Sequence, residues 1–277
     1  MPYSIFHFFR SLADNRGKFR TVRRLDSFPF VRRLLSCRNK GIFPDLAIRL
    51  NGERSIFTGG ELIELKDSAS YTVASFNSTI PSRSKVIADI IAGEASSMRV
   101  QMERAGDDIF SLPERAVYYL VRGRKGGHTK MCLVYGSFFE TVSAEELISQ
   151  SFSQALRERL HESGKTISRE MQEMVTSLLS EQETFSRVRD VKKASVKLRF
   201  RIMTEVKAEG NILNPNTYPE IRDDTLNLVL SCHDDTEEQE QRRKLALVFP
   251  NDELSKCRLF KLKHPLNGHF LVLQMSL

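Results

Sequence analysis

Hydrophobic and polar residues alternate along two short segments in the first quarter of the chain, and such alternation predicts β-strands. The first segment is Asp45–Leu50 and the second is Glu61–Lys66. Between them, Asn51-Gly52 predicts a hairpin turn, because a type I′ turn needs positive φ at both central residues. Gly59-Gly60 predicts a bend or bulge immediately before the second strand.

The middle of the chain combines helical and strand periodicity. Apolar residues at helical spacing predict a helix over Ser84–Arg104. Two further strands are predicted at Ala116–Val121 and Met131–Gly136, joined by a basic, flexible loop at Arg122–Gly127. A helix over Ser143–His161 follows. The order strand, strand, helix, strand, strand, helix predicts an α/β fold with a mixed central sheet.

The last third of the chain is predicted to be mostly β. One more helix covers Ser168–Gln182, and a strand with one apolar and one cationic face begins near Ala194. The acidic run His233–Glu240 is predicted to be a solvated hairpin loop. Residues 183–277 thus form a β-rich C-terminal elaboration, intertwined with the preceding region in one domain. The further predicted strands are Leu226–Ser231, Lys244–Phe249, Arg258–Lys263 and His269–Gln274.

Composition narrows the class of protein. The chain has 277 residues, of which 40% are hydrophobic, and this is enough for a sizeable core. No apolar run approaches the ~18 residues of a membrane span, and the first residues lack a signal-peptide pattern. The four cysteines form no C-x-x-C pair, and the histidines show no ligand spacing. We therefore expect reduced thiols, a cytoplasmic location, and neither a zinc site nor a membrane partner.

Positive charge is concentrated at the start of the chain. The formal net charge is +7. Residues 1–43 carry ten Lys/Arg and two Asp/Glu, a net +8, so the rest of the chain carries −1. We interpret residues 1–43 as a basic N-terminal arm in which Arg23 and Arg24 contact DNA phosphates. The alternative is a pair of basic helices exposed only to solvent.

Three residues suggest chemistry on phosphate. Asp45 begins the first predicted strand, and Glu64 and Lys66 end the second, where alternation places their side chains on one face. Two carboxylates beside an ammonium suit Mg²⁺ and a scissile phosphate. Two other triplets of the same form, Asp190–Lys192 and Glu205–Lys207, lack a Pro-Asp upstream at a strand start. The alternative is an ordinary surface hairpin with a solvated Glu and Lys.

Pro44, Asp45, Glu64 and Lys66 resemble the motif of the PD-(D/E)xK nuclease superfamily, and of type II restriction endonucleases in particular. The resemblance covers roughly residues 43–139 and implies a mixed-sheet nuclease core, flanked by helices, over residues 44–182. It implies that Asp45, Glu64 and the backbone carbonyl of Leu65 bind Mg²⁺, and that Lys66 acts on the attacking water or the phosphate. Many members also have an upstream helical carboxylate, which neither Asp14 nor Asp26 matches convincingly.

Candidate DNA contacts lie in two further segments. The stretch after Lys66 is rich in hydroxyls and small residues, and its alternative role is a polar crossover loop. Lys197 and its neighbours could instead read bases from a β-ribbon in the major groove. The candidates in the first stretch are Ser70, Tyr71, Ser75, Asn77, Ser78 and Thr79, and those in the second are Lys197, Arg199 and Arg201.

The resemblance implies a Mg²⁺-dependent type II restriction endonuclease that hydrolyses double-stranded DNA at a specific sequence. A homodimer is expected, because one site cuts one strand and a palindromic sequence matches two-fold symmetry. A cognate DNA methyltransferase in the same cell would protect the host DNA. Two alternatives stay open: a repair or junction-resolving nuclease of the same superfamily, and a non-catalytic nucleic-acid-binding protein.

Overall fold

A computed structural model of the protein divides into two units. The first unit is Met1–Glu140 with Glu205–Leu277, and the second is Thr141–Thr204. The predicted boundary between residues 182 and 183 therefore falls inside the second unit. The described residues are 3–28, 30–41, 43–50, 58–73, 81–92, 96–140, 154, 156–164, 166, 168–171, 174, 185–189, 195–198 and 210–277.

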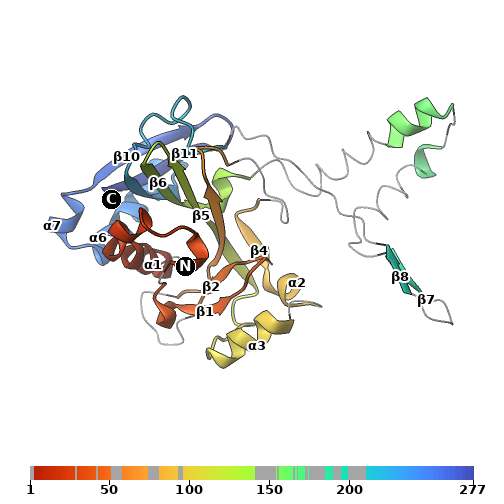
Figure 1. The fold of residues 1–277 in the computed structure, drawn as a ribbon, viewed down its shortest axis with the longest axis horizontal. Coiled ribbons are helices and arrows are strands. Elements are labelled where there is room, and N and C mark those ends of the chain that lie inside the picture. Colours follow the sequence, from red (N-terminus) through yellow and green to blue (C-terminus); the bar gives the residue numbers. More distant parts are fainter. Residues whose placement is uncertain are drawn as a thin grey trace. The chain divides into compact units, whose positions relative to one another are not determined.

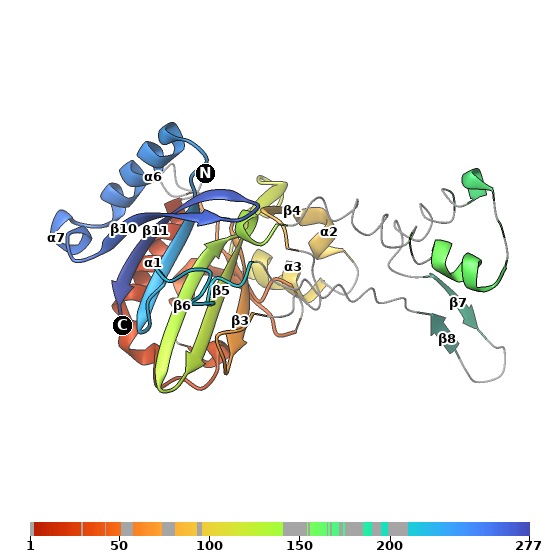
Figure 2. The same cartoon turned by 90° about the horizontal axis from the view of Figure 1, so that it is seen from above.

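The first unit is built around a nine-stranded mixed sheet (Figures 1 and 2). Strands β3 and β5 are parallel, as are β6 and β9, and the other neighbours are antiparallel. The predicted α/β class with a mixed sheet is confirmed. In spatial order the strands are β1 (Leu35–Arg38), β2 (Leu46–Ile48), β3 (Leu62–Ser68), β5 (Glu114–Lys125), β6 (His128–Tyr135), β9 (Thr225–Ser231), β11 (Gly268–Ser276) and β10 (Arg258–His264), and β4 (Ser84–Val86) pairs with β5.

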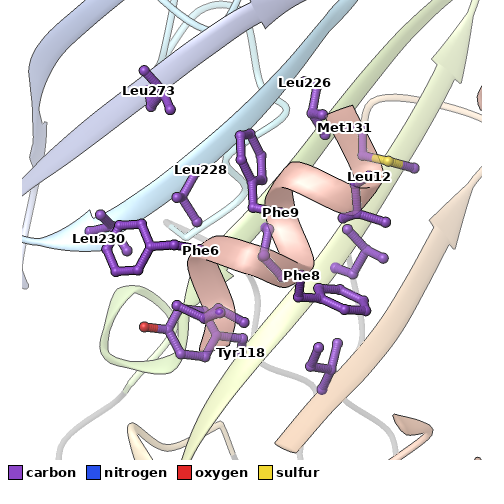
Figure 3. Close-up of a cluster of buried hydrophobic side chains, with 14 of the residues drawn as sticks. Phe6, Phe8, Phe9, Leu12, Tyr118, Met131, Leu226, Leu228, Leu230 and Leu273 are labelled. Carbon is purple, nitrogen blue, oxygen red and sulfur yellow. The ribbon is translucent and has the colours of Figure 1, made fainter. Parts of the chain in front are cut away.

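One face of the sheet is covered by the N-terminal helix α1 (Tyr3–Asp14) (Figure 3). The apolar face of α1, formed by Phe6, Phe8, Phe9 and Leu12, is fully buried against the sheet. Alternation along β3 points Ile63 and Leu65 into the same cluster. The basic residues of positions 1–43 are thus attached to a segment that is built into the core.

The opposite face is covered by α2 (Ile87–Ile91) and α3 (Ser96–Arg104). Met98 and Met102 are buried there, as the helical spacing predicts. The first three residues of the predicted helix Ser84–Arg104 are instead strand β4, which pairs with β5, and Val86 is 45% exposed. A free strand edge supplies backbone partners there, and this tertiary pairing outweighs the local helical pattern.

The prediction of a flexible loop over Arg122–Gly127 is wrong. β5 continues to Lys125 and β6 begins at His128, so the turn consists of Gly126 and Gly127. Both glycines have positive φ, at 58° and 85°, a conformation that side-chain-bearing residues rarely adopt. Arg122 is not in a loop at all, and it is fully buried.

A helix replaces two predicted elements near the C-terminus. Helix α6 (Asp235–Val248) occupies most of the acidic run and of the predicted strand Lys244–Phe249. The Asp234 side chain caps this helix by accepting a hydrogen bond from the Glu237 N–H at 2.8 Å. Gln241, Leu245 and Val248 are buried at i, i+4 and i+7, the spacing of one helix face. Helix α7 (Asn251–Leu254) follows, and the other three predicted C-terminal strands are confirmed as β9, β10 and β11.

Several short elements complete the described residues. Four 3-10 helices are η1 (Arg16–Phe19), η2 (Leu25–Ser27), η3 (Arg32–Leu34) and η5 (Gly136–Phe138). In the second unit, residues 156–162 are helical and Gly164 follows with φ 63°, while β7 (Phe185–Arg189) pairs antiparallel with β8 (Ser195–Leu198). The predicted Asn51-Gly52 turn lies outside the described residues. None of the described helices is long and apolar enough to cross a membrane, and all four cysteines are free.

Candidate active site

The antiparallel pairing of β2 with β3 brings the two candidate carboxylates together. Leu46 pairs with Ile63 and Ala47 pairs with Leu62, a register that places Asp45 opposite Glu64. The Asp45 Oδ2 atom accepts a hydrogen bond from the Leu65 N–H at 2.8 Å. The carboxylate before β2 is therefore held against the backbone of the strand that carries Glu64.

Lys66 joins the same site. Its Nζ atom lies 2.9 Å from Glu64 Oε1, a hydrogen-bonded ion pair between residues two apart on one face of β3. Leu62, at the preceding position of that face, is buried in the cluster beneath α2 and α3. The three residues predicted from the sequence spacing are thus brought together, with a packed apolar floor behind them.

Burial controls the charge of this group. Glu64 is only 7% exposed and Asp45 is partly buried, and desolvation raises the pKa of both carboxyls above its ordinary value. The Asp45 carboxyl raises the pKa of Glu64 further, while the Lys66 ammonium opposes both shifts. Two adjacent carboxylates in a poorly hydrated place favour a shared proton or a bound cation.

One oxygen of Glu64 indicates that the site fits a bound cation. Oε2 is buried, and among the described residues it has no hydrogen-bond partner. A carboxylate oxygen that is shielded from water gains most from a hard cation, and Mg²⁺ binds through one or two carboxylates while keeping several waters. Asp45, Glu64 and the backbone carbonyl of Leu65 fit that donor set. The described part of the chain contains no group of three or more His, Cys, Asp or Glu side chains that could hold a metal ion by themselves.

A third acid, Asp26, lies near this pair. It belongs to η2, which contacts β3, and its charge raises the pKa of Asp45. Its Oδ2 atom also pairs with Lys40 Nζ at 3.4 Å. No sequence motif places Asp26 here, because a single-turn 3-10 helix carries no periodic signal and the contact with β3 joins segments far apart in the sequence.

The two other triplets, Asp190–Lys192 and Glu205–Lys207, lie outside the described residues. Within the stretch after β3, Ser70 is exposed and forms a turn with Ser68, whose Oγ accepts the Ser70 N–H at 3.1 Å. Tyr71 is only 8% exposed and belongs to the core cluster, so burial leaves Ser70 as the more accessible of the two predicted contacts. The predicted contacts Ser75, Asn77, Ser78 and Thr79 lie outside the described residues.

The remaining predicted DNA contacts fall into two groups. Arg23 and Arg24 are exposed in the turn between η1 and η2. Lys197 lies in β8 of the second unit, which is described only by itself, and Arg199 and Arg201 lie outside the described residues. Of the predicted contacts, Arg23, Arg24 and Ser70 are therefore exposed within the first unit, which also contains Asp45, Glu64 and Lys66.

The arrangement of Asp45, Glu64 and Lys66 suits hydrolysis of a phosphate ester. Two carboxylates can hold a divalent cation, and an ammonium beside them can stabilise charge that develops on a phosphoryl oxygen. Comparisons of the chain with protein-family models, with curated proteins and with solved structures found no match.

Proposed function

We propose that this protein is a Mg²⁺-dependent endonuclease for double-stranded DNA, similar to the type II restriction endonucleases of the PD-(D/E)xK superfamily. The observation that carries the proposal is the convergence of Asp45, Glu64 and Lys66, with a buried Glu64 oxygen that lacks a partner among the described residues. The chain order β2, β3, β4, α2, α3, β5, β6 supports the proposed nuclease core, because it keeps the predicted order of two strands, a helical segment and two strands, with the short strand β4 added before the helices.

The chemistry follows from the roles of these side chains. Asp45 and Glu64, with the Leu65 carbonyl, would hold Mg²⁺, which would lower the pKa of the attacking water and neutralise phosphate charge. Lys66 donates a hydrogen bond to the water or to a non-bridging phosphate oxygen. The water loses a proton as its oxygen bonds to phosphorus, the bond to the 3′ oxygen breaks, and the 3′ oxygen takes up a proton in exchange. The Glu64–Lys66 ion pair keeps the ammonium at the reacting centre.

The partners follow from the same reaction. Duplex DNA must be cut on both strands, and one site of this kind serves one strand, so we propose a homodimer. A restriction enzyme also requires a cognate DNA methyltransferase in the same cell to protect host DNA. The free thiols accord with the proposed cytoplasmic location, where cysteines stay reduced.

Cleavage of phage DNA, with and without Mg²⁺, tests the proposal and separates its alternatives. Discrete fragments that require Mg²⁺ support a restriction endonuclease. Smearing, or a preference for branched DNA, assigns the site to repair or junction resolution instead. DNA that stays intact with Mg²⁺ contradicts both nuclease functions. Lys66→Ala is the diagnostic variant, and Lys263→Ala, which removes an exposed lysine on β10, is the matched control.

A further inference from the structure

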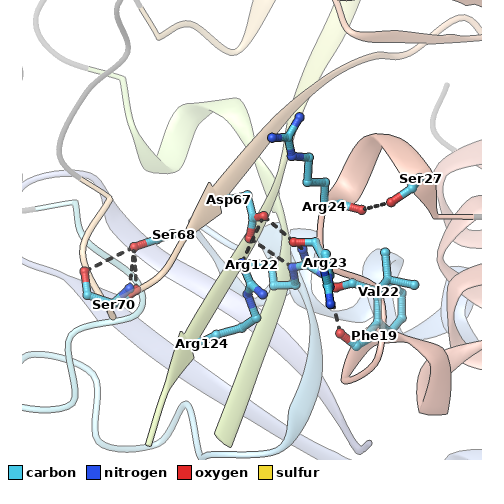
Figure 4. Close-up of polar contacts among 10 residues, drawn as sticks. All are labelled: Phe19, Val22, Arg23, Arg24, Ser27, Asp67, Ser68, Ser70, Arg122 and Arg124. Carbon is cyan, nitrogen blue, oxygen red and sulfur yellow. Dashed lines mark hydrogen bonds and ion pairs between the residues drawn. The ribbon is translucent and has the colours of Figure 1, made fainter. Parts of the chain in front are cut away.

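Arg122 is a buried arginine whose guanidinium has every N–H donor occupied (Figure 4). Nε and Nη2 bind the two carboxylate oxygens of Asp67 at 3.0 and 2.9 Å. Nη1 donates to the carbonyls of Phe19 and Val22 at 3.3 and 2.6 Å, and Nη2 also donates to the carbonyl of Arg23 at 2.9 Å. A guanidinium has five N–H groups, and these five bonds use them all.

These bonds join two segments that are far apart in the sequence. Asp67 lies on β3 directly after Lys66, while Phe19, Val22 and Arg23 belong to a turn that leaves η1. Phe19 is buried and stacks on Phe28 with ring centroids 4.2 Å apart, so the turn is also anchored from below. The backbone of the turn is thereby fixed to the strand that carries Glu64 and Lys66.

The arginine side chains of this turn are exposed, whereas Phe19 is buried. Residues 15–25 carry five Lys/Arg and no Asp/Glu. Arg20 is paired with Asp224 at 3.5 Å, but neither Arg23 nor Arg24 pairs with a carboxylate among the described residues, and both are exposed. In Figure 4 the Arg24 side chain extends away from the Arg122 contacts. The peptide backbone is held inward, and two unneutralised guanidinium groups are presented to the solvent.

We propose that the turn Phe19–Arg24 is a docking surface for the phosphate backbone of duplex DNA, and that Arg122 is the residue that positions it. Alternation along β3 places Asp67 on the face opposite Glu64 and Lys66, so the turn flanks the end of the strand from the other side. Duplex DNA carries about one negative charge per 1.7 Å of its axis, so its phosphates complement the two exposed guanidinium groups of this turn.

The docking surface rests on the proposed function for the identity of its ligand, duplex DNA. It adds a physical connection, through Arg122, between the turn and the strand that carries Glu64 and Lys66. The Arg122 guanidinium binds both segments and so links the position of Arg23 and Arg24 to that of Lys66. Asp67→Asn keeps the shape of the side chain but removes its charge, and it leaves Arg122 its three carbonyl acceptors. The turn then retains its positive charge and its bonds to Arg122, but the guanidinium has lost the carboxylate on β3 that orients it, so the turn is held beside β3 less firmly.

A double-mutant cycle on DNA binding tests this link without relying on cleavage. The probe is a 30-base-pair duplex in metal-free buffer, and the dissociation constant is measured at several salt concentrations. In the wild-type background, changing both Arg23 and Arg24 to Gln weakens binding by about tenfold and flattens the salt slope by about 1–2 units. In the Asp67→Asn background, the same double change costs at most about threefold, because those residues no longer act from a fixed position.

Asp107→Asn is the matched background control. Asp107 also pairs with a buried arginine, Arg115, at 3.1 Å, beneath the opposite face of the sheet, and both side chains of that pair are fully buried. In that background the tenfold loss from Arg23 and Arg24 is expected to persist. Equal losses in all three backgrounds would show that Arg122 has only a structural role. An unchanged salt slope in the Arg23/Arg24 double variant, or no binding by the wild type, would overturn the docking surface itself.

A second measurement needs no variant, in case Asp67→Asn does not fold. Phenylglyoxal modifies accessible arginines, and bound duplex is expected to protect Arg23 and Arg24 but not Arg242 and Arg243 on α6. Equal modification of Arg23 and Arg24 with and without DNA overturns the proposal.

The docking surface and the nuclease function can fail separately. If the wild type binds DNA through this turn but never cuts it, the nuclease function is removed and the docking surface stands. If the wild type cuts DNA but the Arg23 and Arg24 changes do not weaken binding, the nuclease function stands and the docking surface is removed.

Discussion

Asp45 accepts a hydrogen bond from the backbone N–H of Leu65 at 2.8 Å, which ties the carboxylate before β2 to the strand that carries Glu64 and Lys66. The bond orients the Asp45 side chain from the neighbouring strand. It also leaves the Leu65 carbonyl as a separate group that can ligate a cation. The geometry of the candidate site therefore depends on strand pairing as well as on the three side chains.

Replacing Lys66 is expected to affect the chemical step. Lys66→Ala should lower the cleavage rate by about 10³-fold and leave DNA affinity nearly unchanged, because the ammonium stabilises charge that develops only in the transition state. Single-turnover cleavage and a binding titration measure the two effects. Lys263→Ala should behave as wild type. Cleavage by Lys66→Ala within tenfold of wild type would remove Lys66 from the mechanism.

Replacing either carboxylate is expected to abolish metal dependence. Asp45→Ala and Glu64→Ala should each lose cleavage and the Mg²⁺ dependence of DNA affinity, while metal-free DNA binding strengthens because repulsion with phosphate is relieved. Calorimetric titration with Mg²⁺ and a DNA-binding titration with EDTA measure these effects. Full activity in Glu64→Ala, together with loss in Glu205→Ala, would identify the other triplet as the site.

The raised pKa values of Asp45 and Glu64 predict a pH-dependent response to Mg²⁺. Because each folded-state pKa lies above its unfolded value, metal-free stability falls as the pH rises through that interval, where the buried pair must ionise. Mg²⁺ requires the ionised pair, so its stabilising effect should be full above the raised pKa values and vanish as the pH falls through them. Thermal unfolding from pH 4 to 8, with and without Mg²⁺, measures this. Glu64→Gln should lose most of the Mg²⁺ effect at every pH.

Asp26 is expected to contribute charge to the site. Asp26→Asn should lower the pKa of Asp45, because the Asp26 charge raises it, and it should weaken Mg²⁺ binding because one nearby anion is lost. The pH midpoint of Mg²⁺ stabilisation should therefore move down while the affinity at pH 8 falls. Asp14→Asn, which changes the other acid before Asp45 and an exposed one, should change neither quantity.

The buried pair Asp107–Arg115 is expected to matter for stability alone. Its two side chains are fully buried, and Asp107 also accepts the Leu50 N–H at 3.3 Å. Asp107→Ala should lower the free energy of unfolding by about 3–5 kcal/mol, because the Arg115 charge is left buried without its partner. Urea unfolding measures this, and DNA affinity at a temperature where the variant is folded should match the wild type. A loss below about 1 kcal/mol would mean that water replaces the carboxylate.

Local sequence pattern was sufficient to predict the strands whose alternation of apolar and polar residues agrees with their pairing in the sheet. Alternation along Glu61–Lys66 predicted β3 and placed Glu64 and Lys66 on one face, and the structure has their side chains 2.9 Å apart. The strands β9, β10 and β11 were predicted within a few residues of their observed bounds. The pattern gave the wrong element at Ser84–Val86, where pairing with the edge of β5 forms a strand in place of the predicted helix. It was also wrong at Lys244–Phe249, where apolar residues at helical spacing form most of the segment into α6.

The sequence by itself determined which residue types carry the candidate chemistry and how they are spaced along two strands, because strand periodicity is a local property. Only the tertiary structure decided that Asp45 binds the Leu65 backbone, that Asp26 lies near the pair, and that Arg122 joins Asp67 to Arg23. Each of these contacts joins residues at least 19 positions apart, and Arg122 and Arg23 are 99 positions apart. No local pattern encodes such contacts, because they arise when whole elements pack and buried charges take the partners that packing brings within reach.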